Sequence, residues 1–180
     1  MLYLIGANHA QQFKSAVAQM FQESESVRTK RADFTAHVTE MIDKLDIEIL
    51  AEEFSDEAKK KPTPEELEQS SWGTALAQCC WETVLEQFAK AEGLEYRSCD
   101  PDSRERGAHG IDDDEKREQF WLARIQDCKN KNVLFVCGDD HFKSFAEKLI
   151  AEGFDVKHGP RWNISQDEQR IIDYEVWAAS

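Results

Sequence analysis

The segment "NVLFVCGDDH", residues 132–141, contains the strongest strand signal of the chain and ends in the motif Gly-x-x-His. Residues 133–137 are consecutively apolar, and Gly138 follows them directly. A short apolar run that ends at a glycine is typical of a strand buried on both faces, as in a parallel sheet. Asp139, Asp140 and His141 come next. The pattern therefore predicts a buried strand whose carboxyl end carries charged and titratable side chains.

The beginning of the chain has the same arrangement. Residues 2–5 form an apolar run, Gly6 ends it, and His9 completes a second Gly-x-x-His. A shift of 132 positions superposes Gly6 on Gly138 and His9 on His141. We interpret this echo as two related βα halves, in each of which the glycine lets the chain turn off its strand. Two similar turns arising by chance remain the alternative.

Further elements follow from the spacing of apolar residues. Strands are expected within residues 46–53, 94–98 and 154–158, and helices around residues 13–21, 34–45, 77–88, 112–125 and 142–149. Residues 23–31, 55–71 and 99–111 are expected to be a polar connector, a long loop and an irregular stretch. Strands that alternate with helices favour an α/β fold, with a mainly parallel sheet covered by helices.

Size, charge and cysteine content narrow the class of protein. The 180 residues suit a single domain, residues 1–180, in which the tail 160–180 forms an accessory helix. A net charge of −14 repels phosphate backbones and anionic lipids, so neither nucleic acid nor a membrane is expected as a partner. The five cysteines contain no Cys-x-x-Cys and are expected to be reduced, small hydrophobic residues. We expect a cytoplasmic protein, and its five tryptophans leave room for a protein partner.

Polar residues follow several of the predicted strands. In open α/β sheets, ligands bind beyond the carboxyl ends of the strands. The residues expected there are His9, Glu52 or Glu53, Asp100, Asp140 and His141. Histidine with carboxylates can bind a divalent metal such as zinc, manganese or cobalt, or can act as a general base without metal. Either histidine alone is more often structural, and the aspartates can equally cap a helix.

The order of these motifs resembles a known superfamily. Two Gly-x-x-His motifs, a glutamate after the second strand and an arginine that opens a helix are shared by TraB/TIKI-like and erythromycin-esterase-like proteins. The matching segments are "GANH" (6–9), "AEE" (51–53), "REQFWLARI" (117–125) and "GDDH" (138–141). The resemblance implies an α/β fold with two related halves. It also implies a site that hydrolyses peptides with a divalent metal in some members and opens an ester with a histidine base in others. The residues that it implicates are His9, Glu52 with Glu53 as its alternative, Arg117 and His141.

The leading hypothesis is a divalent-metal-dependent hydrolase that cleaves an amide or ester bond of a small molecule or peptide. His9, Glu52 and His141 would hold the metal or act as base, Asp100 and Asp140 would be further ligands, and Arg117 would bind an anion. Arg117 can instead simply pair with an acid one turn earlier in its helix. The rival hypotheses are a non-catalytic module that binds a ligand or protein, and a carrier of metal or haem.

Overall fold

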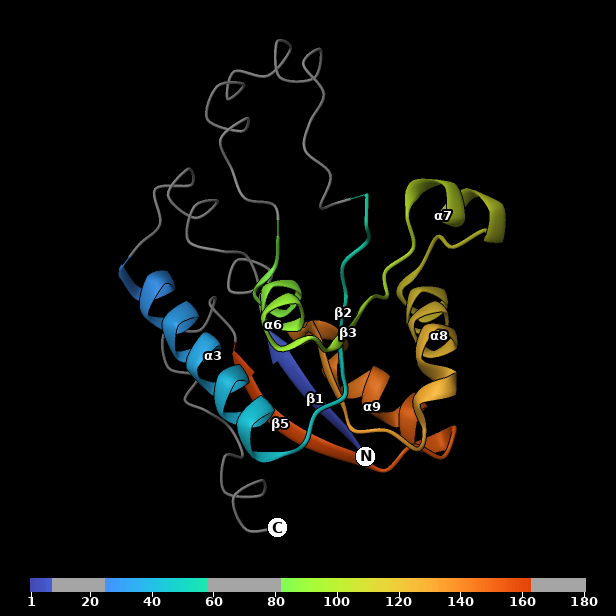
Figure 1. Ribbon diagram of the computed structural model, residues 1–180. Helices are drawn as coiled ribbons and strands as arrows, with labels where there is room; N and C mark the ends of the chain where they lie inside the picture. Colours follow the sequence, from blue (N-terminus) through green and yellow to red (C-terminus); the bar gives the residue numbers. More distant parts are fainter. Residues whose placement is uncertain (8–24, 58–81, 163–180) are drawn as a thin grey trace, which may run out of the picture.

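A computed structural model describes residues 1–7, 25–57 and 82–162 of the chain (Figure 1). Within these residues, a five-stranded sheet has the order β3-β2-β4-β1-β5, and every pair of neighbouring strands is parallel. The strands are β1 (Leu2–Ala7), β2 (Ile49–Glu52), β3 (Glu95–Ser98), β4 (Val133–Gly138) and β5 (Val156–Trp162). The predicted α/β fold with a parallel, helix-covered sheet is confirmed. The central position of β4 explains its uninterrupted apolar run, because both of its faces are covered.

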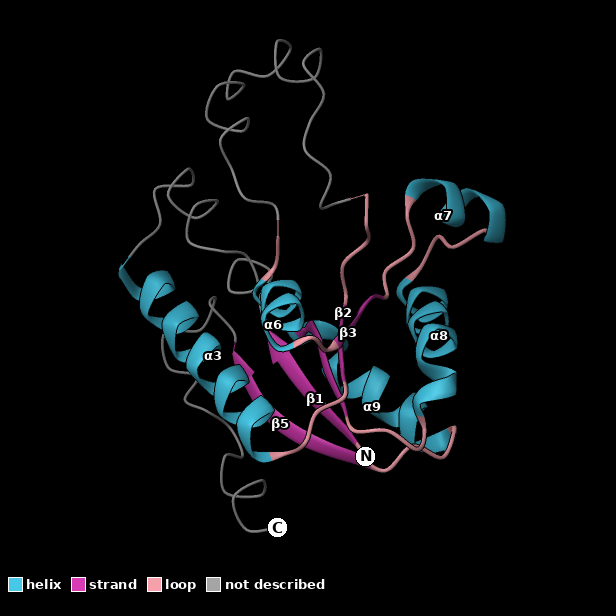
Figure 2. Ribbon diagram, in the orientation of Figure 1, coloured by secondary structure: helices cyan, strands magenta, loops and turns pink. Residues whose placement is uncertain are grey.

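Helices cover both faces of the sheet (Figure 2). They are α3 (Glu25–Lys44), α6 (Val84–Glu92), α7 (Ser103–His109), α8 (Asp114–Ile125) and α9 (Phe142–Ala151), with the short 3-10 helices η1 (Gln126–Cys128) and η2 (Asp139–His141). Helices α3 and α6 pack on one face, whereas α8 and α9 pack on the other (Figure 1). The two connections β2–α6 and β1–α3 include residues outside the described ranges.

Two predicted connectors are partly helical. The polar connector 23–31 is wrong from Glu25 onward, because α3 begins there. The irregular stretch 99–111 contains α7, which the side chain of Asp102 caps in a reciprocal capping box with Glu105. Gly110 ends α7 with a φ of 60°, a backbone conformation that glycine adopts without strain. The segment of α3 before Phe34 and the whole of α7 consist mostly of polar residues, so neither has the apolar periodicity on which the prediction depended.

Three other predictions fall at the edges of the described residues. The helix expected around residues 77–88 begins at Val84, with Thr83 as its N-cap, and ends at Glu92, with Gly93 as its C-cap. Residues 77–81 and the helix expected around residues 13–21 lie outside the described residues. In the tail, residues 160–162 belong to β5, and the rest lies outside the described residues.

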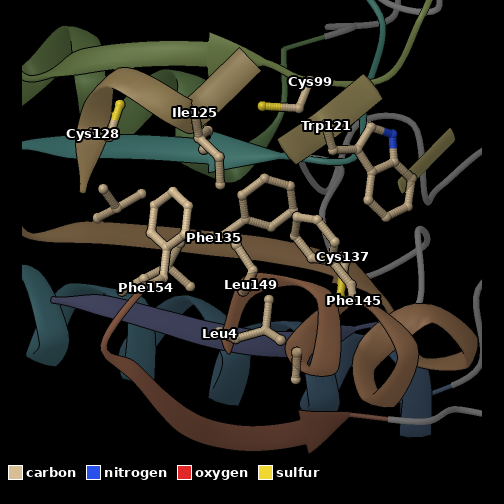
Figure 3. Close-up of a cluster of buried hydrophobic side chains, with 14 of the residues drawn as sticks. Leu4, Cys99, Trp121, Ile125, Cys128, Phe135, Cys137, Phe145, Leu149 and Phe154 are labelled. Atoms are coloured by element: carbon tan, nitrogen blue, oxygen red, sulfur yellow. The ribbon is translucent and has the colours of Figure 1, made fainter. Parts of the chain in front are cut away.

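The core between the sheet and the helices α8 and α9 is aromatic (Figure 3). The Trp121 ring meets Phe145 edge-on at 5.3 Å between centroids, and Phe135 lies 4.8 Å from Phe145. Such ring pairs stabilise a core beyond the burial of their area. This cluster fixes α8 against α9 and thereby positions the side chains that α8 directs toward the carboxyl ends of the strands.

The cysteines in the described residues, Cys99, Cys128 and Cys137, are buried and free. Burial raises the pKa of all three thiols, that of Cys128 to about 11. Their predicted role as reduced, small hydrophobic residues is confirmed, and Cys79 and Cys80 lie outside the described residues. Among the described helices, none is both long and apolar enough to cross a lipid bilayer.

Candidate functional site

A cluster of charged side chains lies beyond the carboxyl ends of β2, β3 and β4. We call it the Arg117 cluster, and its members are Glu53, Asp100, Asp114, Arg117, Glu118 and His141. Glu53 follows β2, Asp100 follows β3, and His141 ends η2 directly after β4. The first turns of α8 supply the other three. Three segments that the sequence predicted to meet at this edge therefore do meet there.

The guanidinium of Arg117 is the centre of the cluster. Its Nη2 donates to Glu53 Oε1 at 2.7 Å, its Nε to Asp100 Oδ1 at 3.1 Å, and its Nη1 to Asp114 Oδ1 at 3.2 Å. Burial opposes the charge, but Asp100 and Glu53 more than offset it and raise the pKa of Arg117 above its ordinary value. The side chain keeps 19% of its surface exposed, so the cation is held firmly and still reaches solvent.

His141 lies beside this cation in a defined orientation. Its Nδ1 lies 2.9 Å from Glu118 Oε1, and Trp121 packs edge-on against its ring at 4.9 Å between centroids. Its Nε2 lies 3.4 Å from Nη1 of Arg117 and 3.6 Å from Oε1 of Glu53. An arginine can only donate, so this contact favours the tautomer with hydrogen on Nδ1 and a lone pair on Nε2.

Glu118 orients His141 and is itself held by α9. Ser144 Oγ donates to its Oε1 at 2.6 Å, and Lys148 Nζ donates to its Oε2 at 2.7 Å. Burial alone would raise the pKa of this carboxyl, but the hydrogen bonds from Lys148, Ser144 and His141 lower it below its ordinary value. A carboxylate with only 2% of its side chain exposed thus stays ionised and accepts from Nδ1 of the imidazole.

Gly138 leaves room for the carboxylate of Glu53 at this edge. Glu53 Oε2 accepts the backbone N–H of Gly138 at 2.6 Å. A Cβ atom at Gly138 would lie 3.0 Å from that same oxygen. The φ of Gly138 is −58°, which any residue adopts, so the predicted role of this glycine in a sharp turn is wrong. The glycine is needed because the carboxylate of Glu53 occupies the space of a side chain.

A side chain at Gly6 would also be too close to its neighbours, one of which, Asp139, belongs to the second Gly-x-x-His motif. A Cβ atom there would lie 3.0 Å from Asp139 Oδ1 and 3.3 Å from Cγ of Arg161. Arg161 holds Asp139 with Nε on Oδ1 at 2.6 Å and Nη2 on Oδ2 at 2.8 Å. The first glycine therefore makes room for the ion pair at the start of η2. His9 lies outside the described residues, and the proposed relation between two βα halves stays a prediction.

The two glutamates after β2 lie in different surroundings. Side chains alternate along a strand, so Glu52 points to the face covered by α3 and α6 and Glu53 to the opposite side. Glu52 accepts hydrogen bonds from the hydroxyls of Thr83 and Tyr96. The choice of Glu52 as the glutamate beside His141 is therefore corrected to its alternative, Glu53, which contacts both Arg117 and His141.

The described residues do not fit a divalent metal. Both oxygens of Asp100 are engaged: Arg117 and Trp121 donate to Oδ1, and Arg106 donates to Oδ2. Asp140 is exposed, and the cation between Glu53, Asp100 and His141 is Arg117 itself. Among the described residues, no group of three or more histidine, cysteine, aspartate or glutamate side chains is arranged to hold a metal ion. Metal ligation that includes His9 stays a prediction.

Glu118 and Arg161 hold residues of the site but are not among the residues predicted from the sequence. A signal for Glu118 was present, because it shares a helical stripe with Trp121 and Ile125, and an acid on a buried stripe needs partners. Lys148 and Ser144, four residues apart on α9, are such partners. For Arg161 the sequence offered no comparable signal, since its pairing with Asp139 depends on β5 lying next to β1.

Comparison of the chain with models of known protein families, with curated proteins and with solved structures finds no match. The resemblance to the TraB/TIKI-like and erythromycin-esterase-like superfamily therefore stays a prediction. The fold and the cluster define an α/β protein with a carboxylate-oriented histidine beside a half-buried arginine at the carboxyl edge of its sheet.

Proposed function

We propose that the protein is a hydrolase of an amide or ester bond in which His141 acts as a general base and Arg117 binds negative charge. The observation that carries the proposal is the pair Glu118–His141, with 2.9 Å between Oε1 and Nδ1. A carboxylate on one imidazole nitrogen fixes the ring and its tautomer, which leaves the other nitrogen to take a proton.

In the proposed reaction, Nε2 of His141 removes a proton from a water molecule, which attacks the carbonyl carbon of the substrate. Glu118 stabilises the imidazolium that forms, because it is ionised and in contact with Nδ1. The same proton can then pass to the leaving amine or alcohol. The histidine returns to its neutral form at the end of the cycle.

Arg117 supplies the positive charge that the reaction requires. Negative charge develops on the carbonyl oxygen in the transition state, and a fixed donor nearby lowers the barrier. Glu53 and Asp100 hold the guanidinium from behind, at 2.7 Å and 3.0 Å from Nη2. This support keeps the donor in place before substrate binds, and Nη1 faces His141 at 3.4 Å.

Hydrolysis of p-nitrophenyl esters and of aminoacyl p-nitroanilides by the full chain tests this proposal. Loss of the base in His141→Ala should lower the rate by about 10²–10⁴-fold, and added imidazole should restore part of it. Glu118→Gln should also lower the rate, because the amide cannot stabilise the imidazolium. The control is Glu147→Gln, the same substitution at an exposed position of α9.

Two results would contradict the proposal. One is hydrolysis that persists unchanged in His141→Ala, and the other is the absence of hydrolysis in the wild-type protein across both substrate series. The second result would favour the rival hypothesis, in which the Arg117 cluster serves a non-catalytic binding module.

A further inference from the structure

Asp114 differs from the other carboxylates that hold Arg117. Its side chain is 71% exposed, whereas those of Glu53 and Asp100 are 2% and 13% exposed. Its Oδ1 lies 3.2 Å from Nη1 of Arg117 and 3.8 Å from Nε2 of His141. A single exposed carboxylate oxygen therefore lies next to both the anion-binding atom and the basic atom of the proposed site.

The attachment of Asp114 to Arg117 is weak. The two residues are three apart in α8, and an exposed pair of this kind contributes little to stability. The inner carboxylates have partners besides Arg117, since the backbone N–H of Gly138 donates to Glu53, and Trp121 and Arg106 donate to Asp100. We therefore expect them to stay on Nε and Nη2 when Asp114 turns away. Nη1 is thus the one edge of the guanidinium, among the contacts described, from which an incoming anion can displace a partner at low cost.

We propose that Asp114 occupies the place of a substrate carboxylate and competes with it for Nη1 of Arg117. This inference rests on the proposed hydrolase function and names its substrate class: an amide or ester whose own carboxylate lies within a few bonds of the scissile carbonyl. The C-terminal residue of a peptide has this arrangement. Nη1 carries two N–H bonds, so one can bind the carboxylate while the other is directed at the carbonyl oxygen. Nη1 and Nε2 of His141 are 3.4 Å apart, so a group bound to the arginine lies within reach of the base.

The charge of the surroundings favours a carboxylate over a phosphate. Glu53 and Asp100 lie on the same guanidinium, and the whole chain carries a net charge of −14. Each additional negative charge on a ligand is repelled by these groups, whereas a singly charged carboxylate replaces Asp114 without changing the local balance.

Binding of acetate to the full chain at constant ionic strength tests the competition. Perturbation of the imidazole signals of His141 reports occupancy. Asp114→Asn should tighten acetate binding by about three- to tenfold, because it removes one repelling charge and leaves only a neutral, weaker acceptor for Nη1. Arg117→Lys should weaken acetate binding, since it loses the planar fork.

The matched control is Asp112→Asn, which removes the same charge two residues earlier. Asp112 is 77% exposed and pairs with Lys116, away from Arg117. Its substitution should change acetate affinity by less than about twofold, the effect of one screened surface charge. Equal effects of the two substitutions would overturn the inference, because general charge repulsion would then explain them.

A pair of substrates separates this inference from the proposed function. An N-acetyl dipeptide with a free C-terminal carboxylate should be hydrolysed faster than its C-terminal amide, and Asp114→Asn should lower KM for the acid only. Faster hydrolysis of the amide would overturn the inference and leave the hydrolase proposal standing. Acetate binding as expected, without hydrolysis of either peptide, would support the anion site and contradict the hydrolase proposal.

Discussion

The two faces of the sheet treat their buried charges differently. On the face covered by α3 and α6, Glu52 is bonded to the neutral hydroxyls of Thr83 and Tyr96, and burial lowers the pKa of His37 to about 4. At the edge next to α8 and α9, Glu53 is paired with Arg117 and His141 is paired with Glu118. The first arrangement keeps its histidine uncharged, whereas the second places an ionised carboxylate ready to receive an imidazolium. The proton chemistry that we propose would therefore take place on the face of α8 and α9.

Arg117→Met should have the largest effect on stability, about 3 kcal/mol, because it removes the guanidinium that pairs with the buried carboxylate of Glu53 and is one of two arginines on Asp100. Chemical denaturation at neutral pH measures it. The control Arg124→Met changes the same residue type on the same helix, where the pair with Glu105 is exposed and contributes less than about 1 kcal/mol. Equal losses in the two variants would show that the Arg117 cluster is no more than surface charge.

Protonation of His37 should have the next largest effect. Its pKa is lowered from 6.5 to about 4, so the folded state favours the neutral form. This contribution is complete above pH 6.5 and is lost as pH falls toward 4, by about 2 kcal/mol between pH 7 and pH 5. Denaturation of wild type and His37→Gln at both pH values isolates it, since the variant lacks this part of the pH dependence. If the free energy of unfolding depends on pH in the same way in wild type and His37→Gln, the contrast between His37 and His141 does not hold.

His37 also shows where sequence reasoning failed. Its position beside Thr35 and Thr39 predicts a residue on a solvated helix face, but it is 6% exposed and lies one turn from the core residues Phe34 and Met41. Apolar spacing locates a helix and its central stripe, but not the polar residues that neighbouring elements cover. The same limit applies to Glu118, which α9 covers.

Predictions that depended on local pattern gave most of the fold. The apolar run of β4 and the alternation of strands with helices predicted the parallel sheet. The order of motifs predicted Arg117 and His141 in one site, and the two side chains lie 3.4 Å apart. Which of Glu52 and Glu53 points toward α8 and α9 depends on how β2 is placed in the sheet. A strand of four residues does not reveal this from its sequence alone. Partners from separate elements, such as Arg161 for Asp139, required the arrangement in space.

Tyr96→Phe should have a smaller effect, about 1.5 kcal/mol, because it removes one hydroxyl donor from Glu52. If the two faces of the sheet act independently, loss of the Tyr96 hydroxyl should leave the imidazole signals of His141 and any hydrolytic rate unchanged. A change at His141 as large as that produced by Arg117→Met would mean that the two faces are coupled through the sheet.

The smallest of the predicted effects is the difference in free energy between the two tautomers of His141. Measuring the tautomer tests most directly the central claim, that Glu118 orients this histidine as a base. Long-range ¹H–¹⁵N correlation spectra of the full chain, assigned with His141→Gln, report which ring nitrogen carries the proton. We predict that neutral His141 has its proton on Nδ1 and that Glu118→Gln weakens this preference, since Nδ1 lies 2.9 Å from the carboxylate. A proton found on Nε2 of the wild-type protein would contradict the account, because the nitrogen that faces Arg117 would then have no lone pair with which to accept a proton.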